Sequence, residues 1–438
     1  MLKTTSMLVI SMAIHYISSR RTFFKIAGLG AVLPIVPSAM NVFPDSHPEP
    51  VPRNKLMVTD IKVYVVKVNQ RGNWYFIELI TNKGLSGFGE ASHAFGNYGS
   101  LADEGNKALQ TEIAYFFELI KGESPFNIEQ FRQRGWNRAV LCKISGTAFS
   151  GIEQALWDLK GKALGLPVYE LLGGKLRNTV KVYANINRAN NDKENSGHRS
   201  VANFQRNAEE ALKNGFKAVK LAPFDEMAPL PSSPARLKTD IDYAANCIQT
   251  IRQTIGNEID LLIDVHSHLN RDLAIEIAKR LETYNLYWFE EPIDPERFVQ
   301  ETKDIKDNIK QNLAGGEAIF GIKGFAPLLQ SNALHIIMPD VKHCGGLQEL
   351  KNIAAIADAS GQVRVAPHNP SGPVSTAVSA HLCANIPNFA ILEFAYGEVP
   401  WRAQLLNPPE QFVNGNIVVN DDPGFGFTLN KKLIETLI

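Results

Sequence analysis

The chain has 438 residues, of which 45% are hydrophobic and 21% charged, a balance typical of globular proteins. This length exceeds what one small core needs, so we expect two packed units or one large α/β barrel with an appended domain. Lysine and arginine together number 45, as do aspartate and glutamate, so the formal net charge is zero. The chain therefore has no overall electrostatic attraction for nucleic acid or an anionic membrane, and an acidic substrate must be held by local groups. The 4 cysteines have no Cys-x-x-Cys or Cys/His spacing, which indicates neither a zinc site nor a disulfide framework.

The N-terminal residues have the features of an export signal. Arg20 and Arg21 precede an apolar run at 26–36 that ends in small residues. This pattern resembles the twin-arginine signals of bacteria. The alternative, an uncleaved membrane anchor, needs an apolar run of about 20 residues, and this run is shorter. We expect 1–40 to be a removable signal and 41–56 a linker, with export to the periplasm and no stable membrane span once the signal is removed.

Residues 57–178 predict a small α+β domain. Hydrophobic and polar residues alternate at 58–68 and 74–80 on either side of a turn, which indicates antiparallel strands. Apolar residues then recur at helical spacing over 103–172. Strands followed by helices, without alternation between them, are typical of an α+β domain.

Residues 179–405 alternate between short apolar runs and amphipathic stretches. Eight runs are typical of strands, at 180–184, 218–221, 260–265, 287–290, 313–317, 336–338, 363–366 and 390–393. Eight strands alternating with helices predict a closed parallel (β/α) barrel of the α/β class, with its active site at the carboxyl ends of the strands. The tail at 406–438 lacks this rhythm, and we expect it to pack on the first domain.

Acidic or histidine side chains fall at the predicted ends of six successive strands. They are Asp264, Glu290, Glu317, Asp340, His368 and Glu393. The intervals are 23 to 28 residues, about one strand and one helix each, so these side chains reach the same rim. Each carboxylate alone is best explained as a salt-bridged strand end, but their recurrence favours a common site. Asp264, Glu290 and Glu317 would form a hard oxygen site suited to Mg²⁺.

The local sequences around these residues resemble motifs of the enolase superfamily. They are Leu-Ile-Asp-Val-His at 262–266, Trp-Phe-Glu-Glu-Pro at 288–292, Gly-Gly-Glu at 315–317, Met-Pro-Asp followed by Gly-Gly at 338–346, and Ser-Gly-Ile-Glu-Gln-Ala-Leu-Trp-Asp at 150–158. The resemblance runs from about residue 57 to the C-terminus, and it implies a modified TIM barrel with an N-terminal α+β capping domain. His368 follows Asp340 by one barrel unit, as in the His–Asp dyad of the mandelate racemase subgroup.

This resemblance implies removal of a proton next to a carboxylate. Asp264, Glu290 and Glu317 would bind Mg²⁺, which binds the substrate carboxylate and stabilises the enediolate. His368 would be the base, and Asp340 would orient its ring. The physical logic agrees, because such a proton is weakly acidic and its removal needs a cation and a base of near-neutral pKa. The alternative for His368 is a hydrogen-bonded histidine in a loop.

Three further positions narrow the reaction. His266 lies two residues after Asp264, on the same face if the strand continues, and resembles the general acid of acid-sugar dehydratases such as galactonate dehydratase. His268 repeats the spacing and competes for this role. Lys220 matches the first lysine of the Lys-x-Lys signature of the subgroup, and either helps to hold the substrate carboxylate or is a buried structural amine. Ala222 stands in place of the second lysine, which disfavours a racemase with two bases.

Substrate contacts are expected at the mouth of the barrel. Glu393 resembles the acid that donates a hydrogen bond to the substrate carboxylate, which requires a raised pKa. Loops that close over the barrel supply further candidates for sugar contacts. These are His93 and Tyr98 from the first domain, Asn185, Asn187 and Arg188 after the first barrel strand, and Trp401 after the last.

The leading hypothesis is a Mg²⁺-dependent dehydratase, a hydro-lyase that acts on an acid sugar. His368 would remove the α-proton, and His266 would protonate the departing β-hydroxyl. The substrate is either an aldonate or a uronic acid at the non-reducing end of an oligosaccharide, and export favours the second. The alternatives are a cycloisomerase or epimerase, and a non-catalytic exported binder of sugar acids. The family resemblance suggests a homo-oligomer.

Overall fold

The computed structural model describes residues 55–69, 72–94, 101–190, 192–193, 196–361 and 363–437, with side chains from residue 104 in the first helix. The expected signal at 1–40, most of the expected linker at 41–56, and Tyr98 lie outside these residues. In the described part of the chain, no helix is long and apolar enough to cross a membrane. The four cysteines are all free thiols.

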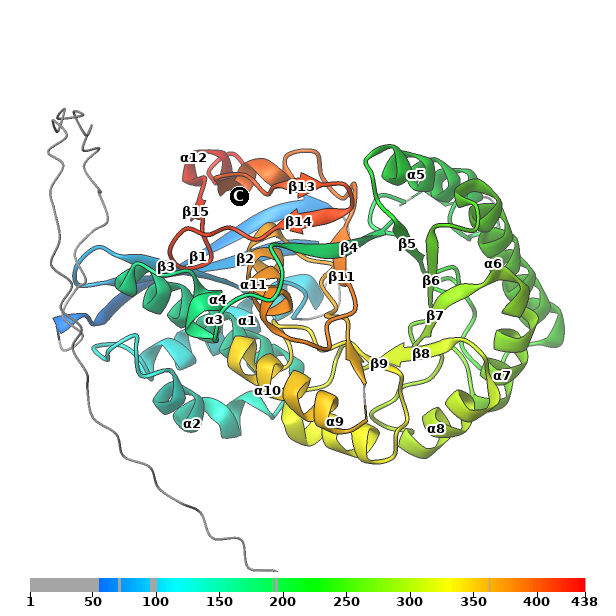
Figure 1. Cartoon of the computed structure of the whole chain (residues 1–438), viewed down its shortest axis with the longest axis horizontal. Coiled ribbons are helices and arrows are strands. Elements are labelled where there is room, and N and C mark those ends of the chain that lie inside the picture. The colour runs from blue at the N-terminus through cyan, green and yellow to red at the C-terminus, as the bar shows by residue number, and fades with distance from the viewer. Residues whose placement is uncertain are drawn as a thin grey trace, which may run out of the picture. The chain divides into compact units, whose positions relative to one another are not determined.

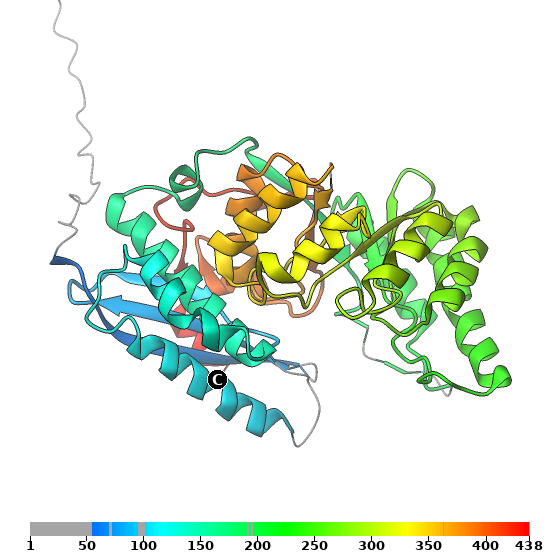
Figure 2. The same cartoon turned by 90° about the horizontal axis from the view of Figure 1, so that it is seen from below.

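The N-terminal domain is an antiparallel sheet packed against helices (Figures 1 and 2). Its strands pair in the order β1–β2–β3, and α3 contacts both β2 and β3. The elements are β1 (Val58–Asn69), β2 (Gly72–Thr81), β3 (Ser86–Glu90), α1 (Leu101–Glu118), α2 (Ile128–Ala139), α3 (Lys143–Leu164) and α4 (Val168–Leu171). The α+β capping domain expected from the sequence is confirmed.

Eight parallel strands form the barrel. Figure 1 shows it with helices on the outside. They are β4 (Thr179–Asn185), β5 (Ala218–Leu221), β6 (Asp260–Asp264), β7 (Leu286–Glu290), β8 (Asn312–Gly315), β9 (Ile336–Ile337), β10 (Arg364–Val365) and β11 (Leu392–Ala395). Strands β4 to β10 pair in chain order, and β11 pairs in parallel with β4. The ring closes where Val365 forms a parallel bridge with Phe389, just before β11.

Seven helices alternate with these strands. They are α5 (Val201–Lys213), α6 (Pro234–Ile255), α7 (Arg271–Arg280), α8 (Val299–Asn308), α9 (Gly321–Gln330), α10 (Gly346–Ala359) and α11 (Pro373–Asn385). The side chains of Ser200, Ser233 and Asn270 accept hydrogen bonds from backbone amides in the first turns of α5, α6 and α7, which fixes where these helices begin. The predicted (β/α) barrel is therefore confirmed.

The chain after β11 packs on the capping domain. Phe427 stacks on Phe88 with ring centroids 5.9 Å apart, and Lys431 donates to Glu78 at 2.7 Å. The elements of this segment are η3 (Arg402–Leu405), β12 (Leu406–Asn407), β13 (Phe412–Val413), β14 (Asn416–Val418), β15 (Thr428–Leu429) and α12 (Lys431–Ile434).

Two buried carboxylates of the capping domain cap barrel helices. Glu153 of α3 accepts hydrogen bonds from the amides of Leu347 and Gln348 in the first turn of α10, at 2.7 and 3.0 Å. Glu90 at the end of β3 accepts from the amides of Gly372 and Ser375 at the start of α11, both at 2.8 Å. A carboxylate at a helix N-terminus satisfies amides that have no partner within the helix and complements the helix dipole. The capping domain thus fixes the two helices that follow β9 and β10.

Candidate active site

The interior of the barrel explains which side chains reach the candidate site. A compact buried cluster is formed by one or more residues of each barrel segment, namely Tyr183, Ala218, Leu262, Trp288, Ala314, Ile336, Met338, Ala366 and Ile391. Side chains two positions apart in a strand point to the same face. The positions two residues after seven of these are Asn185, Lys220, Asp264, Glu290, Asp340, His368 and Glu393. An apolar floor therefore carries a polar ring at the carboxyl ends of the strands.

Glu317 joins this ring by a different route. Strand β8 ends at Gly315, and Gly316 follows with φ +102°, a conformation that side chains rarely adopt. The Glu291 carboxylate holds this turn by accepting hydrogen bonds from the amides of Gly316 and Glu317, at 2.7 and 3.2 Å. The expectation that 313–317 is one continuous strand is wrong, because the chain turns at Gly316.

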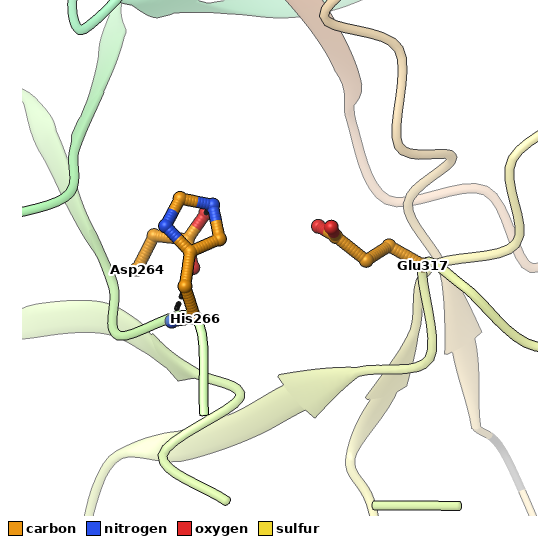
Figure 3. Close-up of side chains that lie close together, drawn as sticks. All are labelled: Asp264, His266 and Glu317. Atoms are coloured by element: carbon orange, nitrogen blue, oxygen red, sulfur yellow. Dashed lines mark hydrogen bonds and ion pairs between the residues drawn. The ribbon is translucent and has the colours of Figure 1, made fainter. Parts of the chain in front are cut away.

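Asp264, His266 and Glu317 lie close enough to hold one metal ion. One candidate ligand atom from each lies within 4.8 Å of the other two. Figure 3 shows Asp264 and His266 together on one side, with the Glu317 carboxylate pointing towards them. Glu317 Oε2 is buried and accepts no hydrogen bond from the described residues, although His368 Nε2 lies 3.1 Å away.

Glu290, the third predicted metal ligand, makes other contacts. One of its oxygens accepts from Lys220 Nζ at 2.9 Å and the other from Trp288 Nε1 at 2.8 Å. The three residues that lie close enough to hold one ion therefore include His266 as well as two of the three predicted carboxylates. Mg²⁺ prefers oxygen ligands, so the donor set that suits it is still Asp264, Glu290 and Glu317, and this ligand set stays a prediction.

Lys220 is the buried counter-charge of the site. Its side chain is 1% exposed, and Nζ lies 3.0 Å from Asp264, 2.9 Å from Glu290 and 3.2 Å from Glu393. Burial lowers the pKa of Lys220, but these carboxylates outweigh burial and raise it well above its usual value. Burial and the Asp264 charge raise the pKa of Glu290 well above the ordinary range. The carboxylates outnumber the lysines here, so a divalent cation fits the charge balance of the site.

His368 and Asp340 form the expected pair. Asp340 Oδ2 lies 2.8 Å from His368 Nδ1, which leaves Nε2 turned towards Glu317. Lys342, also fully buried, donates to both Asp340 oxygens at 2.8 and 2.6 Å. Burial lowers the pKa of His368, but Glu317, Glu393 and Asp340 together raise it above the usual value.

His266 is held by a second carboxylate. Its Nδ1 lies 2.6 Å from Asp225 Oδ1, and its Nε2 lies 3.2 Å from Asp264 Oδ2. His266 was expected beside Asp264 because the strand would continue through both residues. That reason is wrong, because β6 ends at Asp264 and His266 has φ +47° in the turn that follows. Burial lowers the pKa of His266, but Asp264 and Asp225 raise it well above normal. Burial lowers the pKa of His268, the competing histidine.

The expected raised pKa of Glu393 is contradicted. Burial raises the pKa of Glu393, but Lys220, His368 and hydrogen bonds to the carboxylate outweigh burial and lower it to about 2. The hydrogen bonds come from Asn185 Nδ2 at 2.6 Å and the amide of Asn369 at 2.9 Å. An ionised Glu393 accepts hydrogen bonds and cannot donate one, and in this structure it balances the charges of Lys220 and His368.

The candidate sugar contacts fall into separate groups. Asn185 and Asn187 are committed to the scaffold, since Asn185 Oδ1 accepts from Asn187 Nδ2 at 2.9 Å and Asn187 Oδ1 accepts from the amide of Ala222 at 2.7 Å. Trp401 packs edge-on against Trp74 of β2, with ring centroids 5.7 Å apart. His93 and Arg188 do come together, with Nε2 and Nη2 2.8 Å apart.

Sequence reasoning missed several polar residues in and around the site. Asp225 lies in the loop after β5, Glu398 lies in the loop after β11, and Lys342 lies two residues after Asp340. Loop residues follow no strand period, so Asp225 and Glu398 carried no signal. For Lys342 the sequence did contain a signal. A lysine between an apolar strand and a glycine pair is costly to bury without a partner, and Asp340 is the nearest carboxylate in the sequence, so a Lys342–Asp340 pair could have been predicted.

Comparison with known proteins places this architecture in a family. Residues 203–433 match the family Enolase C-terminal domain-like, and residues 57–173 match the mandelate racemase/muconate lactonizing enzyme N-terminal domain. The chain is 31% identical to a D-galactonate dehydratase of Xanthomonas campestris pv. campestris over 83% of this chain and 90% of that protein. It is 34% identical to a D-gluconate dehydratase of Thermoproteus tenax over 66% of this chain, and the match spans 56% of that protein.

A solved structure shows the same fold. The mandelate racemase/muconate lactonizing enzyme from Sulfitobacter sp. superposes with a TM-score of 0.77 and 28% identity, covering 87% of this chain and 95% of that one. Both domains therefore have counterparts in one family, in sequence and in structure. The chain belongs to the mandelate racemase/muconate lactonizing enzyme family of the enolase superfamily.

Proposed function

We propose that this protein is a hydro-lyase that dehydrates an acid sugar. The observation that carries the proposal is that two imidazoles reach two neighbouring carboxylates: His368 Nε2 lies 3.1 Å from Glu317 Oε2, and His266 Nε2 lies 3.2 Å from Asp264 Oδ2. Elimination of water needs one group that takes a proton and another that gives one. Relatives of about the same length are named as dehydratases of sugar acids, which supports this assignment.

His368 would act as the base. Asp340 accepts the hydrogen bond from Nδ1–H at 2.8 Å, so the lone pair of the neutral ring is on Nε2. Nε2 takes the proton from the carbon next to the substrate carboxylate. The electron pair of the C–H bond moves into the substrate carboxylate and gives an enediolate. That electron pair then forms the double bond between the α- and β-carbons, as the β-hydroxyl leaves with its bonding electrons and takes a proton from His266. For an aldonate, the resulting enol becomes a 2-keto-3-deoxy acid, so one water is lost in total.

We further propose Mg²⁺ as the cofactor, held by Asp264, Glu290 and Glu317. When bound, the ion supplies positive charge where the substrate carboxylate gains electron density. The fit rests on the oxygen donors, the excess of buried carboxylates and the buried Glu317 Oε2, which accepts no hydrogen bond from the described residues. Lys220, with its charge shared among three carboxylates, holds Asp264 and Glu290 in place.

Mass spectrometry of the products tests the reaction. The protein is incubated with Mg²⁺ and a panel of aldonates, aldarates and uronate-terminated oligosaccharides, in ordinary and in heavy water. Loss of one water from a panel member supports the dehydratase. Unchanged mass with deuterium incorporation points instead to an epimerase or cycloisomerase, and no change of any kind favours the non-catalytic binder.

Thermal unfolding tests the metal. A ligand that binds only the folded state stabilises it by on the order of 2–3 kcal/mol at about one hundred times its Kd. We expect Mg²⁺ added after chelation to raise the Tm of the protein and to restore turnover. In Asp264→Asn the rise should be much smaller, whereas Asp242→Asn, an exposed carboxylate on α6, should respond like the parent protein. An equal rise in all three proteins would contradict the assigned ligands.

A further inference from the structure

Three side chains from separate segments form one polar cluster at the rim of the barrel. Arg188 lies three residues beyond the end of β4, and Glu398 lies three residues beyond the end of β11. These neighbouring strands are joined at the site by the hydrogen bond between Asn185 and Glu393. The third member, His93, comes from the capping domain just after β3.

The charges within this cluster are already balanced. Arg188 Nε and Nη2 lie 3.0 and 2.7 Å from Glu398 Oε1, and the two side chains are only 10% and 1% exposed. Arg188 Nη2 also lies 2.8 Å from His93 Nε2. Burial, with the Arg188 charge, lowers the pKa of His93 well below its usual value, so the imidazole is neutral. One cation and one anion remain.

Two atoms of the cluster have no hydrogen-bond partner among the residues that the structure describes. Glu398 Oε2 and His93 Nδ1 are buried and form no hydrogen bond with the described residues. A guanidinium can only donate, so His93 Nε2 must accept from Arg188 and the ring proton must be on Nδ1. Within the described part of the chain, the cluster therefore offers one acceptor and one donor that no side chain or backbone group uses. A buried polar atom without a partner costs free energy, and a hydroxyl group satisfies either kind.

We infer that His93, Arg188 and Glu398 form a charge-neutral subsite for the hydroxylated tail of a monocarboxylic sugar acid, and that Glu398 excludes sugar acids with a second carboxylate. The inference rests on the proposed function, because the first carboxylate of the substrate binds at the polar ring that contains Asp264, Glu290 and Glu317. A second carboxylate would meet the Glu398 anion, while Arg188 has no uncompensated charge to offer it. A terminal hydroxyl meets no such repulsion.

The test uses two pairs of acids that differ only at the far end, D-gluconate with D-glucarate and D-galactonate with D-galactarate. Each acid is titrated into the full protein in a calorimeter, with Mg²⁺ present. The aldonate should bind more tightly than the aldarate in at least one pair, by roughly tenfold or more, and kcat/KM should be higher for the aldonate of that pair. Equal or tighter binding of the aldarates would overturn the inference, and so would the absence of binding by all four acids.

Glu398→Gln removes the negative charge and leaves Arg188 uncompensated. The ratio of aldarate to aldonate in binding and in kcat/KM should rise by roughly tenfold or more. The matched control is Glu349→Gln, which removes the carboxylate of another buried pair, 2.6 Å from Arg132. The control should keep the parent ratio, and an unchanged ratio in Glu398→Gln would contradict the inference. If that variant does not fold, the comparison of the four acids on the parent protein still decides.

Failure of the two proposals can be told apart. Equal turnover of aldonates and aldarates leaves the dehydratase intact and overturns the neutral subsite. Lack of water loss from any acid overturns the dehydratase, while the calorimetric preference continues to test the subsite.

Discussion

The two histidines of the site have similar surroundings but different exposure. One nitrogen of each ring contacts a carboxylate, Asp340 for His368 and Asp225 for His266. The other nitrogen faces a predicted metal ligand, Glu317 for His368 and Asp264 for His266. The His368 side chain is 11% exposed and that of His266 is 39% exposed. A base that removes a carbon-bound proton works best when it is shielded from water. An acid that protonates a departing hydroxyl can lie at the more exposed mouth of the barrel.

These roles predict that the two histidines can be separated by isotope exchange. His368→Asn should lower kcat by about a hundredfold to ten-thousandfold and should also abolish exchange of the α-proton with heavy water. His266→Asn should lower dehydration by a comparable factor but keep that exchange, because the base is intact. The measurement is deuterium content of recovered substrate by mass spectrometry. Exchange that is lost in His266→Asn and kept in His368→Asn would reverse the assignment.

Single residues were predictable where strand geometry decides their direction. Asp264, Asp340, His368 and Glu393 all continue the inward face of a strand, so the two-residue period was sufficient. Glu317 reaches the ring through the left-handed turn at Gly316, and His266 through its own positive φ. The charge state of Glu393 depends on Lys220, which lies far away in sequence, so only the folded structure could show that its pKa is low.

At the scale of elements, helix N-termini connect the two domains. Helices α10 and α11 begin just after the segments that carry Asp340 and His368, and Glu153 and Glu90 cap them from the capping domain. Position 346 has no room for a side chain, because a Cβ on Gly346 would lie 2.2 Å from Glu153 Oε2. Removing either cap should therefore disturb the segments that hold the base.

The Glu153 cap predicts a specific dependence of stability on pH. Burial raises the pKa of Glu153 to about 7, and the nearby Arg132 only partly offsets this. The folded protein binds this proton more tightly than the unfolded chain does. The resulting stabilisation is complete below the unfolded pKa near 4.5 and is lost as pH rises through about 7, by on the order of 3 kcal/mol.

Glu153→Gln removes this titration. The free energy of unfolding of the parent relative to the variant should fall between about pH 5 and pH 8 by on the order of 3 kcal/mol, because only the parent must bury a new charge. Urea unfolding at both pH values gives the difference. Glu129→Gln, on the exposed face of α2, controls for the loss of a carboxylate as such. A difference between Glu153→Gln and the parent that stays constant with pH would contradict the prediction.

Elements were predictable from the sequence because their patterns are regular. The eight apolar runs correspond to β4 to β11 with small shifts at the ends, since alternating short strands and amphipathic helices allow few other folds. The contacts between the domains were not predictable. In the sequence, Glu90 and Glu153 look like ordinary charged residues. Only in the folded chain do backbone amides at helix N-termini lie 2.7 to 2.8 Å from their carboxylate oxygens.

At the scale of the whole molecule, zero net charge contrasts with an acidic interior site. Buried carboxylates that depend on a cation are most at risk when the cation is absent, and a protein exported in the folded state can bind its ion before it leaves the cell. We therefore propose that the twin-arginine pattern directs the protein to the periplasm.

Replacing the pair with lysines tests this proposal. Arg20→Lys with Arg21→Lys keeps the positive charge of the segment but removes the paired arginines, so a route that recognises arginine should fail while one that needs only charge should not. In fractionated bacterial cells we expect the parent protein in the periplasm, shortened by about forty residues, and the double variant in the cytoplasm at full length. Lys3→Arg, upstream of the pair, should behave like the parent. Equal periplasmic amounts of parent and double variant would exclude the twin-arginine route, and a parent found only in the cytoplasm would exclude export and remove the reason to favour extracellular oligosaccharides as substrates.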